Sequence, residues 1–473
     1  MKIHFIGIGG TGMGAAAGLM AEAGHEVRGS DGPIYPPMSD LLRDLAIDVT
    51  EGYDAKNLDW KPDLVVLGNT CKSEHVEYKA AIALGHRIVS FPQLLEETLL
   101  KERQSIVVAG THGKTTTTSL ISYLLKATGK KPGYLVGGIP QDLGRSFAIG
   151  QPPYFVIEGD EYDSACFDRV PKFTHYRAKL AVITGIEFDH ADIYPNLEAI
   201  ESAFIKLIDS VAKDGQLLVN ALCPVTMKLV QRRPEIVCGY EVHPADSAHT
   251  ARPHTDWVGV YRPRSDGRQE LTVSYRNRHR FTITVKMSGG HNMANVLAAA
   301  AIGAHLEIPG EEITTALAKF SGVRRRQEVV GEAKGVVVID DFAHHPTAVA
   351  ETLKGLKAMQ SGGRLIAVFE PRSSTSRRNI FQRDYAEALE AADRVCIAPL
   401  YSVDNIAPED RLNLDQLVED LRKNGTASDH YESVSQIIEA LSKECRPGDT
   451  VLAMSSGGFE GIHRRLLEAL EKA

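Results

Sequence analysis

Apolar positions along the first hundred residues form short buried runs separated by helix-like segments. Runs at 2–6, 25–28, 63–67 and 87–89 predict strands, and a stretch of small residues at 12–23 predicts a helix. Strands that alternate with helical patterns indicate a parallel sheet. A charged stretch then precedes a second α/β pattern, so we expect a Rossmann-like first domain over residues 1–103.

The second part of the chain continues with strand-like runs at 105–109, 154–157 and 180–184. A polar stretch at 241–285 alternates in period two, which is typical of antiparallel strands. A helix of small residues, "GGHNMANVLAAAAIGAHL", follows. These features predict a central P-loop ATPase-like α/β domain with added antiparallel strands over residues 104–321.

The last part of the chain repeats one arrangement, a buried strand that opens into a polar loop. It occurs in "GVVVIDDFAHHP", "RLIAVFEPRSS", "RVCIAPL" and "DTVLAMSSGG". We therefore expect a second Rossmann-like, doubly wound sheet over residues 322–473, with ligands beyond the carboxyl ends of its strands. The segment "SGVRRRQE", residues 321–328, lies between two apolar segments and predicts a hinge.

Composition narrows the class of protein. The 473 residues leave room for about three domains. Hydrophobic content of 43% and charged content of 24% are typical of a soluble globular protein. A net charge of −8 and a pI near 6.1 do not favour nucleic acid, and no run of apolar residues is long enough to predict membrane insertion. Six scattered cysteines without a C-x-x-C pair favour a reducing, cytoplasmic setting.

The stretch "GTHGKTTTT", residues 110–118, joins a predicted strand to a predicted helix. Its glycines let the backbone wrap an anion, Lys114 supplies a positive charge, and Thr115 or Thr116 can place a hydroxyl on Mg²⁺. The usual P-loop has a glycine where Val108 stands. The alternative, a threonine-rich helix start with a solvated lysine, is disfavoured because β-branched residues are poor helix formers.

A second glycine-rich loop, "GIGGTGMG" at residues 7–14, follows the first strand. With Asp31 at the end of the next strand it completes the Rossmann fingerprint, in which backbone N–H groups bind a diphosphate. From these residues alone the ligand could be NAD or FAD, another diphosphate, or none if the loop is only a tight turn.

Two acidic loops follow buried strands of the central domain. "VIEGDEYDS", residues 156–164, and "TGIEFDHAD", residues 184–192, carry the side chains Glu158, Asp160, Glu161, Asp163, Glu187, Asp189, His190 and Asp192. Clustered carboxylates repel one another, so a divalent cation would stabilise them. A solvated acidic loop is the alternative, and His190 taken alone would more often be structural.

Three further segments give weaker indications. In "GGHNMANVL", the amides of Asn292 and Asn295 share a helix face and could bind a base, although Asn292 could equally cap the helix. "DDFAHHP" is weak by itself. The arginines of "EPRSSTSRR", residues 370–378, suit a substrate carboxylate or phosphate, or form a solvated face.

Taken in order, "GIGGTGM", "GTHGKTTT", "EGDEYD", "EFDHAD", "HNMANVLAA", "GVRRRQE" and "DDFAHHP" resemble the Mur ligases, the ATP-dependent amide-forming family of bacterial cell-wall synthesis. The resemblance covers nearly the whole chain. The nucleotide loop of that family lacks the earlier glycine, and its first domain holds a UDP-sugar rather than NAD. It implies domain closure over ATP about the arginine hinge.

The resemblance also implies roles for individual residues. Lys114, Glu158 and His190 would be catalytic: Lys114 would neutralise the β and γ phosphates, Thr115 and Glu158 would hold a first Mg²⁺, and His190 a second. Residues implied at ATP are Gly110, Thr111, His112, Gly113, Lys114, Thr115, Thr116, His291, Asn292, Asn295, Arg326 and Asp341. Residues implied at the UDP-sugar are Gly9, Gly10, Thr11, Gly12, Ser30, Asp31, Asn69 and Thr70, and those implied at substrate carboxylates are Arg372 and Arg377.

The forms "EGDEYDSACFDRVPKFTHYRA" and "EPRSSTSRR" are similar to the branch of the family that recycles wall peptide. That branch joins L-alanyl-γ-D-glutamyl-meso-diaminopimelate to UDP-N-acetylmuramate through an acyl phosphate formed by ATP. The alternative is the branch that adds L-alanine by the same chemistry. A distant alternative is an NAD-dependent oxidoreductase, which would leave the motifs between 105 and 346 without a role.

Overall fold

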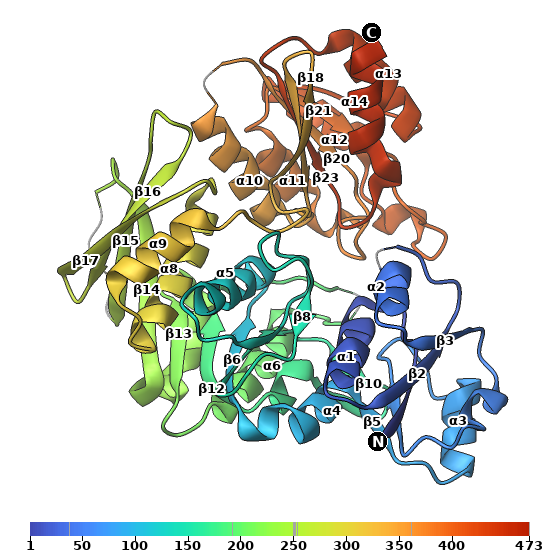
Figure 1. Ribbon diagram of the computed structural model, residues 1–473. Coiled ribbons are helices and arrows are strands. Elements are labelled where there is room, and N and C mark those ends of the chain that lie inside the picture. Colours follow the sequence, from blue (N-terminus) through green and yellow to red (C-terminus); the bar gives the residue numbers. More distant parts are fainter. Residues whose placement is uncertain (37, 192, 249–251, 253, 361, 473) are drawn as a thin grey trace.

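The computed structural model describes residues 1–36, 38–191, 193–248, 252, 254–360 and 362–472. Three α/β lobes, each built on its own sheet, follow one another along the chain (Figure 1). The three-domain α/β fold class expected from the sequence is confirmed. We propose that the domains end at residues 103 and 321, as expected from the sequence. Each of these positions precedes the first strand of a new sheet, β6 (Gln104–Ala109) or β18 (Glu328–Ala333).

The first sheet is parallel throughout and confirms the expected βαβ rhythm. Its strands, in spatial order, are β3 (Asp48–Glu51), β2 (Glu26–Asp31), β1 (Lys2–Ile6), β4 (Leu64–Leu67) and β5 (Ile88–Ser90). Its helices are α1 (Thr11–Glu22), α2 (Met38–Asp44), α3 (Val76–Ala83) and α4 (Phe91–Thr98). The loops that follow β1, β2 and β4 meet at one edge, where the predicted UDP-sugar residues lie.

The middle sheet is the largest and carries the nucleotide loop near its centre. In spatial order its strands are β17 (Arg278–Val285), β16 (Gln269–Tyr275), β15 (Thr255–Pro263), β14 (Val237–Pro244), β13 (Gln216–Asn220), β12 (Ala178–Ile183), β6 (Gln104–Ala109), β9 (Tyr154–Gly159), β7 (Gly133–Leu135) and β8 (Phe147–Ala148). A separate hairpin is formed by β10 (Asp163–Ala165) and β11 (Asp168–Pro171), and the helices are α5 (Lys114–Ala127), α6 (Leu197–Ser210), α7 (Pro224–Leu229), α8 (Gly290–His305) and α9 (Gly310–Lys319).

The expectation of antiparallel strands over 241–285 is confirmed for β15 to β17 and wrong for β14. β14 pairs in parallel with both of its neighbours. Alternation of polar and apolar residues reports that one face of a strand is buried, and it does not report the direction of the neighbouring strand.

The third sheet is parallel except for its edge strand β18. In spatial order it contains β18 (Glu328–Ala333), β19 (Val336–Asp341), β23 (Thr450–Met454), β20 (Leu365–Phe369), β21 (Arg394–Ile397) and β22 (Ala427–His430). The helices α10 (Pro346–Met359), α11 (Gln382–Leu389), α12 (Leu414–Lys423), α13 (Val434–Glu444) and α14 (Ile462–Lys472) pack on it.

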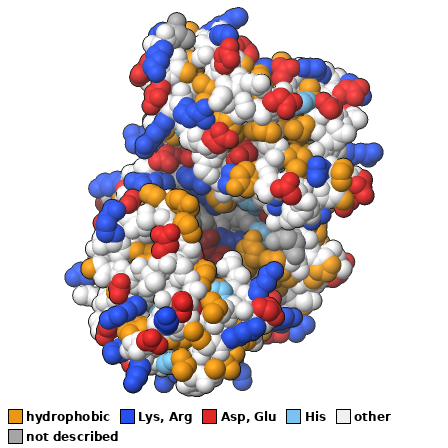
Figure 2. Space-filling view, turned by 90° about the vertical axis from the view of Figure 1, so that its right-hand side faces the viewer, with side chains coloured by type: hydrophobic (Ala, Val, Ile, Leu, Met, Phe, Trp, Pro, Cys, Tyr) orange, Lys and Arg blue, Asp and Glu red, His pale blue; other side chains and the backbone are white. Residues whose placement is uncertain are grey.

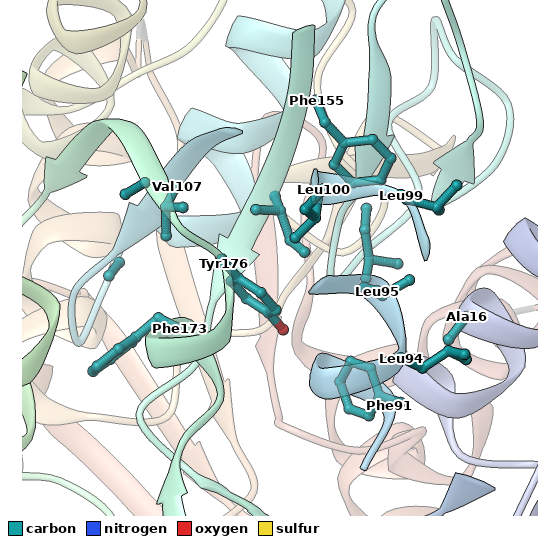
Figure 3. Close-up of a cluster of buried hydrophobic side chains, with 14 of the residues drawn as sticks. Ala16, Phe91, Leu94, Leu95, Leu99, Leu100, Val107, Phe155, Phe173 and Tyr176 are labelled. Carbon is teal, nitrogen blue, oxygen red and sulfur yellow. The ribbon is translucent and has the colours of Figure 1, made fainter. Parts of the chain in front are cut away.

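One hydrophobic core joins the first lobe to the middle lobe. Helix α4 inserts Leu94 and Leu95 into it, and Phe155 and Phe173 of the middle lobe belong to the same cluster (Figure 3). An ion pair of 2.6 Å between Glu22 and Arg145 also connects the two lobes. The third lobe packs its sheet into two separate clusters. The first two lobes therefore form one packed body, and the third is attached through the arginine hinge.

The threonine-rich start of α5 is accommodated by hydrogen bonds within the helix. Thr118, Ser119 and Ser122 donate to carbonyl oxygens one turn earlier, at 2.8, 2.6 and 2.7 Å. Hydroxyls bonded in this way can be buried without an unsatisfied donor. This allows α5 to pack against the alanine-rich α8 while its first turn stays at the nucleotide loop.

Candidate active site

Three loops of the middle lobe meet beneath the third lobe. Strands β12, β6 and β9 are neighbours in the sheet, so the loops at their carboxyl ends lie side by side. Figure 2 shows the hollow between the third lobe, above, and the rest of the molecule, with acidic, basic and histidine side chains on its walls.

The nucleotide loop requires both of its glycines. Gly110 and Gly113 have φ of +135° and +81°. A Cβ at Gly110 would collide with the Thr184 hydroxyl, and one at Gly113 would lie 2.6 Å from Asn295 Oδ1. The loop therefore presents bare backbone at the start of α5, an arrangement that favours close approach of an anion.

Lys114 reaches back over this loop. Its Nζ donates to Gly110 O at 2.7 Å and lies 3.2 Å from Glu161 Oε2. Burial alone would lower the pKa of Lys114, but the carboxylate of Glu161 and its acidic neighbours raise it above the ordinary value. The side chain is a stable cation, as a group that neutralises phosphate charge must be.

Glu161 is the ion-pair partner of Lys114, a role that the sequence did not indicate. Burial tends to raise the pKa of Glu161, but the positive charge of Lys114 and a hydrogen bond from His190 lower it to about 2. His190 Nε2 lies 3.0 Å from Glu161 Oε1, and its Nδ1 lies 2.6 Å from the Tyr162 hydroxyl. A metal at His190 would have to replace one of these partners.

His190 is held in an unusual backbone conformation, with φ of +57°. Burial tends to lower the pKa of His190, but the hydrogen bond to Glu161 and the charge of Asp189 raise it above the ordinary value. Asp192 of the same loop lies outside the described residues.

Thr115 and Glu158 form the pair that the resemblance implies for a first metal ion. Thr115 Oγ1 donates to Glu158 Oε1 at 2.9 Å, and Gly137 N–H donates to Glu158 Oε2 at 2.7 Å. Burial and the nearby Asp160 raise the pKa of Glu158. Adjacent ligands of octahedral Mg²⁺, with bonds of about 2.0–2.1 Å, lie about 2.9 Å apart. The two oxygens therefore fit neighbouring positions on such an ion.

The polar residues at the start of α8 lie behind the nucleotide loop. Asn295 Oδ1 accepts from Thr117 Oγ1 at 3.0 Å, and Asn292 Nδ2 donates to a backbone carbonyl one turn earlier at 2.8 Å. Burial lowers the pKa of His291 to about 4, so its ring is neutral near pH 7. Gly289 occupies the N-cap position of α8, so the alternative that Asn292 caps this helix is wrong.

The arginine hinge reaches the nucleotide loop through Arg326. Its Nη2 donates to Thr115 Oγ1 at 3.5 Å, and its guanidinium lies 4.7 Å from the ring centroid of Phe342. Asp341 accepts backbone N–H bonds from Gln327 and from the residue two positions after itself, each at 2.7 Å. The carboxylate of Asp341 therefore fixes the backbone of the hinge.

Two threonines of the third lobe donate to carboxylates of the middle lobe. Thr347 Oγ1 bonds Glu187 Oε2 at 2.7 Å, and Thr375 Oγ1 bonds Asp189 Oδ1 at 3.0 Å. Burial tends to raise the pKa of Asp189, but the surrounding histidines lower it to about 2. The roles of both threonines were missed at the sequence level, because hydroxyl residues in polar loops carry no signal of long-range pairing.

In the first lobe, Asp31 organises the glycine-rich loop. Its Oδ2 accepts Gly9 N–H at 2.6 Å, and its Oδ1 accepts the Tyr53 hydroxyl at 2.7 Å. Ser30 is fully buried and donates its hydroxyl to Glu77, so that hydroxyl is not available to a ligand. Among the other predicted residues, those exposed at this edge are Gly10, Thr11, Asn69 and Thr70.

The two predicted carboxylate-binding arginines line one pocket of about 570 Å³ in the third lobe. Arg372 stacks on Tyr401, with the guanidinium carbon 3.6 Å from the ring centroid. Arg377 donates to the carbonyl oxygens of Ser373 and Tyr401, at 3.2 and 3.1 Å, and to that of Ser402. Arg372 Nη1 also lies 3.5 Å from Glu370 Oε1, whereas Arg377 is held by three carbonyl oxygens and braces the pocket wall.

Fold and site together define a class of protein, a three-domain nucleotide-dependent enzyme whose third domain contacts a short nucleotide loop. Comparison with protein families then gives a match along nearly the whole chain. Residues 2–103 match "Mur ligase family, catalytic domain", residues 108–303 match "Mur ligase middle domain", and residues 325–457 match "Mur ligase, glutamate ligase domain".

Among individual proteins, a UDP-N-acetylmuramate–L-alanyl-γ-D-glutamyl-meso-2,6-diaminoheptandioate ligase of Escherichia coli K12 is 37% identical, covering 100% of this chain and 99% of that protein. A murein peptide ligase structure from Psychrobacter arcticus shares 34% identity with a TM-score of 0.70, covering 100% of this chain and 99% of that one. A UDP-N-acetylmuramate-alanine ligase structure from Thermotoga maritima shares 25% identity with a TM-score of 0.79, with the same coverage.

The chain belongs to the Mur ligase family, which consists of ATP-dependent ligases that form carbon–nitrogen bonds. The glycine-rich loop of the first lobe therefore belongs to a ligase, and the NAD-dependent oxidoreductase alternative is set aside. In the part of the chain that the structure describes, no helix is both long and apolar enough to span a membrane.

Proposed function

We propose that the protein joins the α-amine of L-alanyl-γ-D-glutamyl-meso-diaminopimelate to the lactyl carboxylate of UDP-N-acetylmuramate, at the expense of ATP, in recycling of cell-wall peptide. The observation that carries this proposal is 37% identity, along the whole chain, to an E. coli ligase named for that reaction. The motif forms at 158–178 and 370–378 support the same branch.

The proposed chemistry begins because a free carboxylate does not form an amide in water. ATP transfers its γ-phosphoryl group to the carboxylate of UDP-N-acetylmuramate, and the resulting acyl phosphate is attacked by the peptide amine. The tetrahedral intermediate then releases phosphate. Lys114 and Arg326 would stabilise charge on the transferring phosphoryl group, since both cations converge on the nucleotide loop.

The residues around Thr115 fit the Mg²⁺ that such a reaction needs. We propose that Thr115 Oγ1 and Glu158 Oε1 bind the ion side by side, with His190 as the candidate ligand of a second ion. When bound, Mg²⁺ would supply positive charge against the phosphates of ATP. For the rest of the ATP molecule, we propose that the adenine lies beside His291, Asn292 and Asn295. The ribose would lie near Asp341.

The pocket around Arg372 supports a peptide over a single alanine. It is lined by Arg372 and Arg377 and also by Asp404 and Asn405, so it presents groups of both signs over about 570 Å³. The tripeptide carries three carboxylates and a second free amine at its diaminopimelate end, whereas alanine has one carboxylate and only the reacting amine. We assign the peptide to this pocket and the UDP-sugar to the exposed glycine-rich loop around Gly10.

The cell compartment follows from the substrates and the thiols. All six cysteines are free. A supply of ATP and a reducing environment that keeps thiols unpaired both point to the cytoplasm. We therefore propose that the enzyme acts there on recovered peptide.

A phosphate-release assay tests the proposal. The enzyme with ATP, Mg²⁺ and UDP-N-acetylmuramate should release phosphate when the tripeptide is added, and mass spectrometry should find the UDP-muramoyl tripeptide. L-Alanine at the same concentration serves as the comparison. Turnover with alanine and none with the tripeptide would move the protein to the alanine-adding branch, with the same family chemistry.

A further inference from the structure

A cluster of metal-binding side chains lies beside the proposed Mg²⁺ residues and is distinct from them. His112 comes from the nucleotide loop, Glu187 from the loop after β12, and His345 from the start of α10 in the third lobe. We propose that these three residues bind a divalent transition-metal ion of the Zn²⁺ class. The bound ion would connect the third lobe to the nucleotide loop.

The three ligand atoms already form the triangle that a tetrahedral ion needs. His112 Nε2 lies 3.3 Å from Glu187 Oε2 and 3.2 Å from His345 Nδ1, and His345 Nδ1 lies 3.6 Å from Glu187 Oε2. A tetrahedral ion with bonds of about 2.0–2.1 Å holds its ligands about 3.3 Å apart. The three side chains can therefore hold an ion with little movement of their ligand atoms.

Surrounding contacts orient the cluster for a metal. His345 Nε2 lies 3.1 Å from Phe188 O, so this nitrogen carries the proton and Nδ1 presents its lone pair to the cluster. Metal-bound histidines commonly donate the other ring N–H to a carbonyl in this way. Thr347 Oγ1 donates to Glu187 Oε2 at 2.7 Å, which fixes the carboxylate. An ion would replace the contacts of His112 Nε2 with His345 Nδ1 and Glu187 Oε2, displacing the proton on that nitrogen, and the 3.3 Å bond from Thr347 N–H to His345 Nδ1.

The donor set separates this site from the one for Mg²⁺. Two imidazoles and one carboxylate suit Zn²⁺ and its neighbours in the first transition row, whereas Mg²⁺ prefers oxygen ligands and water. Because the ligands come from two lobes, binding would stabilise the arrangement in which the third lobe covers the loop. The inference does not depend on the identity of the peptide substrate.

Titration with Co²⁺ tests the site in the full-length protein, with Mg²⁺ in excess to occupy the oxygen-rich positions. One equivalent should give the visible absorption of tetrahedral Co²⁺, and Zn²⁺ should abolish it by displacement. His345→Gln and Glu187→Gln, in different lobes, should each weaken binding more than about 100-fold, beyond the usual loss from removing an outer partner. Circular dichroism confirms that each variant is folded.

Two control variants locate the ion. His279→Gln, at an exposed position of β17, should bind Co²⁺ as the wild type does. His190→Gln should also bind it, because His190 is not part of the cluster. The proposal is overturned if the wild type shows no tetrahedral signal, if both ligand variants titrate like the wild type, or if binding is lost in His190→Gln.

Discussion

Thr375 and Thr347 make the same type of contact between the third lobe and the middle lobe in very different surroundings. Thr375 and its partner Asp189 are each 3% exposed. Thr347 is exposed, and the side chain of its partner Glu187 is 40% exposed. Replacing each threonine by the nearly isosteric valine exchanges the hydroxyl for a methyl group, so the pair of variants compares the loss of the same contact in buried and exposed surroundings.

The expected magnitudes differ accordingly. A buried hydrogen bond to a charged group contributes about 1.5–3 kcal/mol. Thr375→Val also removes the acceptor of Ala191 N–H, which donates to the same hydroxyl at 3.4 Å. A loss of about 2 kcal/mol lowers the ratio of closed to open molecules roughly thirtyfold. At Thr347 water competes for both groups, so Thr347→Val should cost below about 1 kcal/mol.

Fluorescence energy transfer between labels on the first and third lobes measures closure as ATP and UDP-N-acetylmuramate are added. Thr375→Val should need roughly thirtyfold more ligand for half closure, Thr347→Val at most about fivefold, and Thr375→Ser should behave as the wild type. Equal shifts for the two valine variants, or no shift in Thr375→Val, would refute the reasoning that the buried contact controls closure.

Three further predictions concern Lys114 of the nucleotide loop and two carboxylates beside it, Glu158 and Glu161. Lys114→Ala should abolish phosphate release while circular dichroism shows the fold retained, and a fully active variant would contradict the role given to the loop. Glu158→Gln should raise the Mg²⁺ concentration for half-maximal activity at least about tenfold, because a neutral amide binds the ion more weakly than a carboxylate. A Mg²⁺ titration of activity measures this change. An unchanged Mg²⁺ requirement would place the ion elsewhere. Glu161→Gln should destabilise by about 3 kcal/mol in urea unfolding near pH 7, since the pKa of Glu161 falls from 4.5 to about 2 on folding. The stabilisation by the Glu161 carboxylate is present above about pH 4.5 and is lost as pH falls through about 2. The control Asp163→Asn, at an exposed position of the same segment, should change the unfolding free energy little. A destabilisation of Glu161→Gln that does not depend on pH would argue against the ion pair.

The sequence predicted the parts of the site that depend on a strand followed by a loop. Lys114, Thr115 and Glu158 are near one another because β6 and β9 are adjacent parallel strands, and their motifs were evident. The pairing of Glu161 with both Lys114 and His190 was not evident. Three carboxylates of the acidic segment follow β9, and only the three-dimensional course of the loop selects Glu161 for burial.

Contacts between lobes were the least predictable. The stretch from Glu96 to Gln104 was interpreted as a charged segment before a domain boundary, yet Leu99 and Leu100 within it are buried in the core that joins the first two lobes. The apolar side of a short helix gives no indication of which neighbouring surface it covers. Ser30 was expected after a strand that ended at residue 28, but β2 extends to Asp31 and includes it, and its burial against Glu77 was invisible in the sequence.

The shared core has a consequence for the order of the reaction. Full burial of a leucine contributes about 1.5–3 kcal/mol, so separating the first lobe from the middle lobe at Leu94, Leu95 and their neighbours would cost many kcal/mol. The proposed UDP-sugar and ATP sites therefore keep a fixed relation, and we infer that domain closure is a movement of the third lobe. Arg326 and the proposed peptide pocket would move with it. The acyl phosphate would then be protected from water only when the lobe that brings the peptide amine has closed, which would couple activation of the carboxylate to the presence of its acceptor.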